Sequence, residues 1–237
     1  MKTALLSILL GATLAASAAE QSTPPEGDRP TLVIRKKGNP IMPQRLIELG
    51  VQDGEVRLVI NVDSTGKLSE WLVVGYTHPA LADAVVAAVK RWDFEPPRWR
   101  GEPISIQREL QFRLESHGTV VSIYSPTYID SYLAQRFPDR YVFKPCTLKE
   151  LDRIPTPLNA PAPIAPKLPD GQTERHVVVE FFIDPTGAVR MPSVISSEDP
   201  DLEAASVQAV RDWRFEPPTR QGRPTLVHVQ QTFRFQR

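Results

Sequence analysis

The sequence predicts an α+β protein of two β-β-α-β modules, each a three-stranded antiparallel sheet with a helix on one face. One observation is an internal repeat, in which Asp184 and Gly187 follow Asp63 and Gly66 at an offset of 121 positions. The other is a change of hydrophobic period within each copy, from two to about 3.6 and back to two. The offset is far longer than the roughly 20–50 residues of stacked repeats, which favours two separate domains.

Each copy opens with a strand in which every second residue is apolar, over 54–62 in the first copy and 176–183 in the second. A turn containing Asp and Gly follows, because Asp can bond its own backbone and Gly adopts positive φ. Alternation resumes over 67–75 and 188–196, so the two strands of each copy are expected to form a hairpin.

A helix is predicted from Pro79 to about Trp92, and its counterpart starts after Asp199, a natural N-cap. The third strand is predicted over 104–114 and 225–235. A helix between strands two and three favours the sheet order 2-1-3 with strand three at an edge, although strands two and three could also be adjacent. The aromatic and leucine positions on the helix stripe and just after it are expected in the core: Leu81, Trp92, Phe94, Leu202, Trp213 and Phe215.

The N-terminus resembles a secretory signal, since Lys2 precedes a short apolar run and Ala18 or Ala19 ends a small-residue cleavage site. The run is shorter than the ~20 residues of a membrane-spanning helix. The expected organisation is a signal peptide (1–19), a flexible segment (20–38), a first domain (39–115), a connector with a Pro-rich end (116–159) and a second domain (160–237). Within the connector, 119–124 reads as a strand that could fold back on strand three of the first copy.

Composition argues against several functional classes. Lys and Arg (28) balance Asp and Glu (28), so no net charge favours nucleic acid. The single cysteine, Cys146, allows no internal disulfide and is expected to be buried. The histidines follow no metal-ligand spacing, and no nucleophile or phosphate-loop motif is present. We therefore expect no enzyme, no metal, no cofactor and no small-molecule substrate.

The order of the repeated motifs resembles the TonB C-terminal domain family. These motifs are Gly-x-Val, Asp-x-x-Gly, Leu-x-x-Ala, Trp-x-Phe-x-Pro-Pro, Gly-x-Pro and, in the second copy, the terminal pair Phe233 and Phe235. The resemblance implies a periplasmic α+β module of Gram-negative bacteria. It also implies a partner, because the family's energy transducers bind the extended TonB box of an outer-membrane receptor beside their last strand.

An edge strand offers unpaired backbone groups, so strand three of the second copy is the candidate binding site. The chain continues only one or two residues past this strand, so nothing downstream is expected to cover it. The hypothesis is that a receptor or another envelope protein pairs with it along these residues: Val227, His228, Val229, Gln230, Gln231, Thr232, Phe233 and Arg234. The alternative is a structural role in which edges pair within the chain or in a homodimer. An uncleaved N-terminus would instead make the chain an inner-membrane anchored energy transducer.

Overall fold

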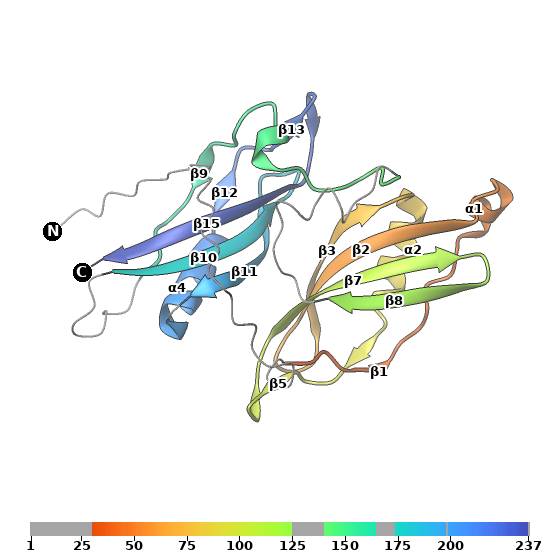
Figure 1. Ribbon diagram of the computed structural model, residues 1–237, viewed down its shortest axis with the longest axis horizontal. Helices are drawn as coiled ribbons and strands as arrows, with labels where there is room; N and C mark the ends of the chain where they lie inside the picture. The colour runs from red at the N-terminus through yellow and green to blue at the C-terminus, as the bar shows by residue number, and fades with distance from the viewer. Residues whose placement is uncertain (1–29, 125–139, 165–173, 198, 237) are drawn as a thin grey trace, which may run out of the picture.

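The computed structural model describes residues 30–124, 140–164, 174–197 and 199–236. The expected signal peptide at 1–19 therefore lies outside the described residues. The described chain is α+β, with two main sheets side by side, mostly antiparallel strands, three α-helices and one short 3-10 helix (Figure 1). None of the helices in these ranges is both long and apolar enough to cross a membrane.

The first sheet has four strands in the order β3-β2-β7-β8. Every neighbouring pair is antiparallel, so β3 and β7 run parallel with β2 between them, as the order 2-1-3 requires. The expected three-stranded sheet is wrong here, because the chain turns back after β7 and adds β8. The elements of this half are β1 (Ile34–Lys36), α1 (Gln44–Glu48), β2 (Asp53–Val62), β3 (Leu68–Tyr76), α2 (Pro79–Val89), β4 (Asp93–Phe94), β5 (Arg98–Trp99), β6 (Glu102–Pro103), β7 (Ile106–Glu115) and β8 (Gly118–Tyr124).

The second sheet has three strands in the order β11-β10-β15, and all its pairs are antiparallel. In the described residues no fourth strand follows β15, which leaves β15 at the edge of the sheet (Figure 1). The elements of this half are the 3-10 helix η2 (Leu148–Glu150), β9 (Pro157–Asn159), β10 (Glu174–Ile183), β11 (Val189–Ser197), α4 (Pro200–Arg211), β12 (Arg214–Phe215), β13 (Thr219–Arg220), β14 (Arg223–Pro224) and β15 (Val227–Gln236).

The turn between the first two strands of each sheet is held by its aspartate. The Asp63 carboxylate accepts hydrogen bonds from the Thr65 amide (2.9 Å), the Thr65 hydroxyl (2.6 Å) and the Lys67 amide (3.0 Å). Asp184 accepts the equivalent three bonds in the second sheet. The glycine of each turn has positive φ, which only glycine adopts without strain. The repeated motif is thus explained by turn formation.

The helix starts differ between the copies. The side chain of Asp199 accepts bonds from the amides of Asp201 and Leu202, which satisfies the first turn of α4. His78 stands before α2 and makes no such capping bond. In both copies a proline occupies the first helical position. Its missing amide hydrogen is tolerated there, because that amide has no acceptor within the helix.

Each sheet also carries a short strap, formed by residues 33–38 in the first half and 156–161 in the second. In the first strap, the Glu95 amide donates to Val33 and the Trp92 indole donates to the Gly38 carbonyl at 2.9 Å. In the second, the Glu216 amide donates to Thr156 and the Trp213 indole to the Pro161 carbonyl at 2.9 Å. The repeat therefore extends N-terminally at an offset of 123 positions. The domain boundaries drawn from sequence remain predictions.

Each half has one hydrophobic core, which lies between its sheet and its own helix. The two cores contain the tryptophans and phenylalanines of the repeat. All six expected core residues are at most 7% exposed. A third cluster lies between the two sheets, on the faces away from the helices. It contains Val59, Leu72, Val74, Tyr141, Met191 and Leu226. This cluster was not predicted, and it joins the two halves back to back.

Candidate functional site

The backbone groups on one side of β15 pair with β10. The strand pairs with β10 over ten residues, from Val227 opposite Ile183 to Gln236 opposite Glu174. In an antiparallel strand the amide and carbonyl of one residue point to the same side, and successive residues alternate. The odd-numbered or the even-numbered residues of β15 must therefore point to its outer side.

The connector shows which residues face outward. The Cys146 amide donates to the Leu226 carbonyl at 2.8 Å, and the His228 amide donates to the Cys146 carbonyl at 3.0 Å. These bonds form a single parallel bridge at the start of the strand. Even-numbered residues therefore present their backbone groups to the outer edge.

Beyond this bridge the edge is free within the described residues. Gln230, Thr232, Arg234 and Gln236 point outward and pair with no other described strand. The side chain of Gln231 donates to the Thr232 carbonyl at 2.9 Å, where a neighbouring strand would otherwise donate. We call residues 230–236 the free edge.

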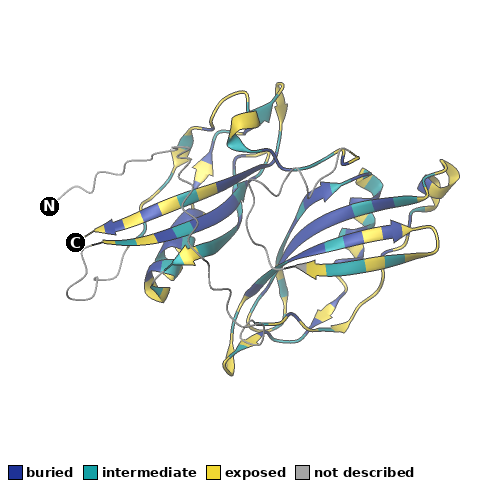
Figure 2. Ribbon diagram, viewed as in Figure 1, coloured by how far each residue is buried: buried dark blue, intermediate teal, exposed yellow. Residues whose placement is uncertain are grey.

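The side chains of β15 divide into buried and exposed sets (Figure 2). Val227, Val229 and Phe233 belong to the second core, and the His228 side chain is also buried. Gln230, Thr232 and Arg234 are exposed, and Gln231 is half-buried. Of the eight residues expected to meet a partner, only Gln230, Gln231, Thr232 and Arg234 present side chains to solvent. At Val227, Val229 and Phe233 the backbone faces β10, and the His228 amide is already bonded to the Cys146 carbonyl.

His228 is turned into the interior, where it faces a buried carboxylate. Its Nε2 atom lies 3.4 Å from the Glu180 carboxylate, and its ring contacts Phe182 edge-on at 5.0 Å between centroids. Ser193 donates to the other carboxylate oxygen of Glu180 at 3.1 Å. The equivalents of His228 and Glu180 in the first copy are Gln107 and Val59, so this pair is specific to the second half.

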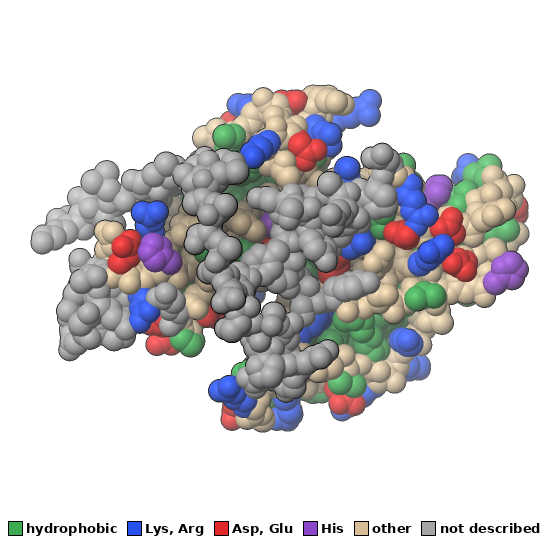
Figure 3. Space-filling view, viewed as in Figure 1, with side chains coloured by type: hydrophobic (Ala, Val, Ile, Leu, Met, Phe, Trp, Pro, Cys, Tyr) green, Lys and Arg blue, Asp and Glu red, His purple; other side chains and the backbone are tan. Residues whose placement is uncertain are grey.

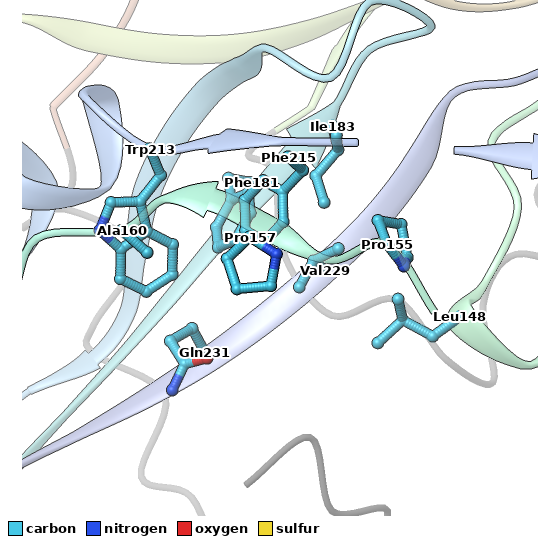
Figure 4. A pocket seen from close by; sticks show the side chains of 10 residues that line it. All are labelled: Leu148, Pro155, Pro157, Ala160, Phe181, Ile183, Trp213, Phe215, Val229 and Gln231. Atoms are coloured by element: carbon cyan, nitrogen blue, oxygen red, sulfur yellow. The ribbon is translucent and has the colours of Figure 1, made fainter. Parts of the chain in front are cut away.

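An apolar pocket lies beside the free edge, on the helix side of the sheet (Figure 4). Val229 and Gln231 of β15 line it together with Leu148 and Pro155 of the connector and with Trp213 and Phe215 of the second core. Its free volume of about 20 Å³ is room for about one water molecule. The pocket is thus too small for a substrate molecule, but its rim adjoins the place where an added strand would lie.

Charge and chemistry near the edge are unremarkable. On the face shown in Figure 3, basic and acidic side chains are interspersed, in keeping with the balanced composition. Across the ranges that the structure describes, no group of three His, Cys, Asp or Glu residues could hold a metal ion. Cys146 is buried, as expected, and its sulfur lies 3.3 Å from the Thr225 hydroxyl.

The corresponding edge of the first sheet is covered. β8 pairs with β7 from Glu109 to Glu115, which are the equivalents of Gln230 and Gln236. From the sequence, this pairing was one possibility for residues 119–124, although the expected sheet had three strands. The sequence profile of the Gram-negative bacterial TonB protein C-terminal family matches residues 38–114 and 171–236, which is more than half of the chain. The chain belongs to this TonB C-terminal family.

The two matched segments agree with tandem copies of the TonB C-terminal domain. No curated protein matches the chain. Membership of the TonB C-terminal family indicates a TonB-like role in protein interaction within the Gram-negative envelope, with another protein as the partner.

Proposed function

We propose that this TonB C-terminal protein works in the periplasm, where it binds an extended segment of another envelope protein as an added strand on β15. The observation that carries the proposal is the free edge: among the described residues, the outward backbone groups of 230–236 lack a neighbouring strand, whereas their equivalents in the first sheet are paired with β8. Unpaired edge groups are a template for strand addition, and main-chain bonds supply most of the affinity in that mode.

The proposed partner is a TonB-dependent outer-membrane receptor or another envelope protein, engaged as part of TonB-dependent transport. Export would remove residues 1–19 and place both domains in the periplasm. If that segment is retained, the chain is instead an anchored energy transducer. The mature N-terminus, read by mass spectrometry of the protein from periplasmic extract, distinguishes these cases. A chain that begins near residue 19 or 20 supports the released form.

A second candidate function rests on the same free edge. Two copies could pair their β15 strands antiparallel, which would satisfy the same backbone groups and give a structural homodimer without a peptide ligand. Sedimentation at micromolar concentration separates the two proposals. A monomer with a free edge supports peptide binding, and a stable dimer that excludes peptides supports the structural role.

The peptide-binding proposal is tested by titrating the isotope-labelled mature chain with receptor-derived peptides that contain the extended box. We expect amide shifts that concentrate at Gln230, Thr232 and Arg234. Thr232→Pro removes an outward amide hydrogen without removing a bond to β10, so it should abolish binding and leave the fold intact. Thr232→Ala is the matched control and should bind as the natural chain does. Peptide binding that Thr232→Pro does not weaken would place the site elsewhere.

A further inference from the structure

Residues 33–49 contain β1, α1 and the chain between them, which lies on the side of the first half that faces away from the second half (Figure 1). We call these residues the outer segment. Within the described residues ten large hydrophobic side chains are exposed, and the outer segment carries four of them: Val33, Ile41, Ile47 and Leu49. Ile41 is 81% exposed and Leu49 is 70% exposed. Exposed apolar side chains that gather in this way indicate an interaction surface.

These aliphatic side chains point outward because their neighbours are fixed inward. Pro40 and Met42 are buried on either side of Ile41, and Leu46 of α1 belongs to the first core. The Thr119 hydroxyl also donates to the Pro40 carbonyl at 2.7 Å. The outer segment is therefore held against the domain, and its aliphatic side chains are presented at fixed places.

Basic side chains accompany the aliphatic ones. The basic residues of the outer segment are all exposed: Arg35, Lys36, Lys37 and Arg45. Arg35 pairs with Glu95 at 3.4 Å, whereas within the described ranges no ion pair involves the other three. Glu48 is the only acidic residue of the outer segment. This surface is therefore positive, on a chain whose formal net charge is zero.

The charges beside the outer segment do not cancel it. Asp93 lies opposite Lys36 on β4, and Glu95 follows two residues later. Lys90 and Arg91, at the end of α2, are exposed next to them and balance these two carboxylates. The positive charge of the outer segment is left over.

The second half lacks this combination. At the offset of 123 that relates the two straps, Arg35, Lys36 and Lys37 correspond to Leu158, Asn159 and Ala160. Leu158 is exposed, so the second strap also shows an aliphatic side chain, but it has no basic residue at these places. The basic charge is thus specific to the first half, and the second strap is a matched control.

Exposed aliphatic side chains among unpaired basic ones fit an anionic lipid surface. Aliphatic side chains enter the boundary between headgroups and acyl chains, while Lys and Arg contact the headgroup phosphates. A soluble acidic polymer would use the charges but would gain nothing from Ile41 and Leu49. An uncharged apolar partner would leave Lys36 and Lys37 without a counterpart.

We propose that the outer segment docks the protein on a membrane surface with anionic headgroups. Ile41 and Leu49 enter the interface, and Lys36, Lys37 and Arg45 contact the headgroup phosphates. This inference goes beyond the proposed function and does not depend on it. Because the outer segment faces away from the second half, docking leaves the second half accessible.

The test is co-sedimentation of residues 20–237 with two kinds of vesicle. One kind contains equal parts of phosphatidylglycerol and phosphatidylethanolamine, and the other contains phosphatidylcholine alone. We expect binding to the first kind only, and a loss of binding at high salt because the charges are screened. Equal binding to both kinds, or binding to neither, would overturn the inference.

Variants locate the surface. Lys36→Gln combined with Lys37→Gln should weaken binding to the anionic vesicles by about tenfold. Arg211→Gln combined with Arg223→Gln removes two exposed charges from the second half and should leave binding unchanged. Equal losses in the two double variants would show that net charge, rather than the outer segment, controls binding.

The aliphatic contribution is tested in the same way. Ile41→Ser should weaken binding by about fivefold or more, and Leu158→Ser, on the second strap, should not. If Ile41→Ser binds as the natural chain does while the double lysine variant is weakened, the surface suits an acidic polymer or protein, and the lipid assignment is wrong. All these side chains are exposed, so melting curves should confirm that the variants stay folded.

A fluorescent label reports insertion directly. A polarity-sensitive dye on Ile41→Cys should shift to the blue when anionic vesicles are added, whereas the same dye on Leu158→Cys should not. Cys146 is only 1% exposed, so it should remain unlabelled in the folded chain. An unshifted spectrum at Ile41→Cys would contradict entry into the interface. Peptide titration of the double lysine variant is independent of these results, so the two proposals can fail separately.

Discussion

At the scale of single residues, Gly187 is the most constrained position of the second copy. Its φ is +86°, and a Cβ built there would lie 2.0 Å from the Phe215 carbonyl oxygen. The Gly187 carbonyl also accepts the Phe215 amide hydrogen bond at 2.9 Å. The turn is thus in direct backbone contact with Phe215 of β12, as the turn at Gly66 is with Phe94 in the first copy. This contact explains a glycine at this place in both copies.

Gly187→Ala should therefore lower the free energy of unfolding by about 2–4 kcal/mol, since backbone strain and a backbone clash add. Gly222→Ala is the matched control, because Gly222 also has positive φ but has no atom within 4 Å of the added Cβ. It should cost only about 1–2 kcal/mol. Urea unfolding of both variants measures the difference. Equal losses would show that the contact with Phe215 is unimportant.

Asp63 gives a prediction with a pH dependence. The hydrogen bond from the Thr65 hydroxyl, with those from the Lys67 and Thr65 amides, lowers the pKa of Asp63. Since the folded pKa lies below the unfolded value, this stabilisation is present above the unfolded pKa and is lost as the pH falls through the folded one. Asp63→Asn should lower the Tm at pH 7, and the difference from the natural chain should shrink as the pH falls below about 4. Melting curves across this range test it, and a difference that does not depend on pH would contradict it.

At the scale of elements, the two straps have the same anchor. The Trp213 indole donates to the Pro161 carbonyl, and Trp92 does the same to Gly38. Trp213→Phe should lower the free energy of unfolding by about 1–3 kcal/mol, because it removes this bond and part of the ring. It should also speed hydrogen exchange of the Glu216 amide, which donates to Thr156 of the strap.

Trp92→Phe is the matched variant for the first strap. It should speed exchange of the Glu95 amide and leave that of Glu216 unchanged. A substitution that alters both amides equally would indicate global destabilisation rather than release of one strap.

The regular elements were predicted well from sequence, because alternation over eight or more residues is a strong signal. The six long strands begin and end within two residues of their expected positions, and the Asp199 cap was anticipated. The straps were not predicted. β1 and β9 have only three residues each, which shows no period, and the offset changes from 121 to 123 there. Helix α1 was missed for the same reason, since it has five residues.

The candidate site was predicted only in part. The predicted order 2-1-3 placed strand three at an edge of each sheet. The alternation over residues 119–124 suggested that a further strand covers this edge in the first copy. The bridge from Cys146 was not predicted, because one residue paired with a strand leaves no periodic signal. The burial of His228 was also missed, since it depends on Glu180 of a neighbouring strand and on the contact between the sheets.

At the scale of the whole molecule, the two halves share a core. A signal for it existed, since Val59, Leu72 and Val74 lie on strand faces that an isolated module would leave to solvent. Polar contacts reinforce it: Arg190 donates to the Glu70 carboxylate at 2.7 Å and to the Trp71 carbonyl at 2.9 Å. The connector adds Tyr141, which donates to the Glu55 carboxylate at 2.7 Å. Burial, and then this bond, raise the pKa of Tyr141 to about 12.

The natural chain should therefore unfold in one cooperative transition. Leu226→Asp places a charge in the cluster between the sheets and should divide the transition into two, one for each half. Gln230→Asp is the control four residues further on, on β15, where the side chain is exposed, and should keep a single transition. Calorimetry distinguishes these results. Two transitions in the natural chain would show that the shared core does not couple the halves.

We propose that β15 accepts an added strand at an edge that is free within the described residues, while the corresponding edge of β7 is covered by β8. Amide hydrogen exchange, measured with and without a receptor-derived peptide, is the direct test. We predict that the peptide slows exchange at Gln230, Thr232 and Arg234 and leaves their β8-covered counterparts, Glu109, Gln111 and Arg113, unchanged. Unchanged exchange along β15, or equal slowing on both strands, would contradict the claim.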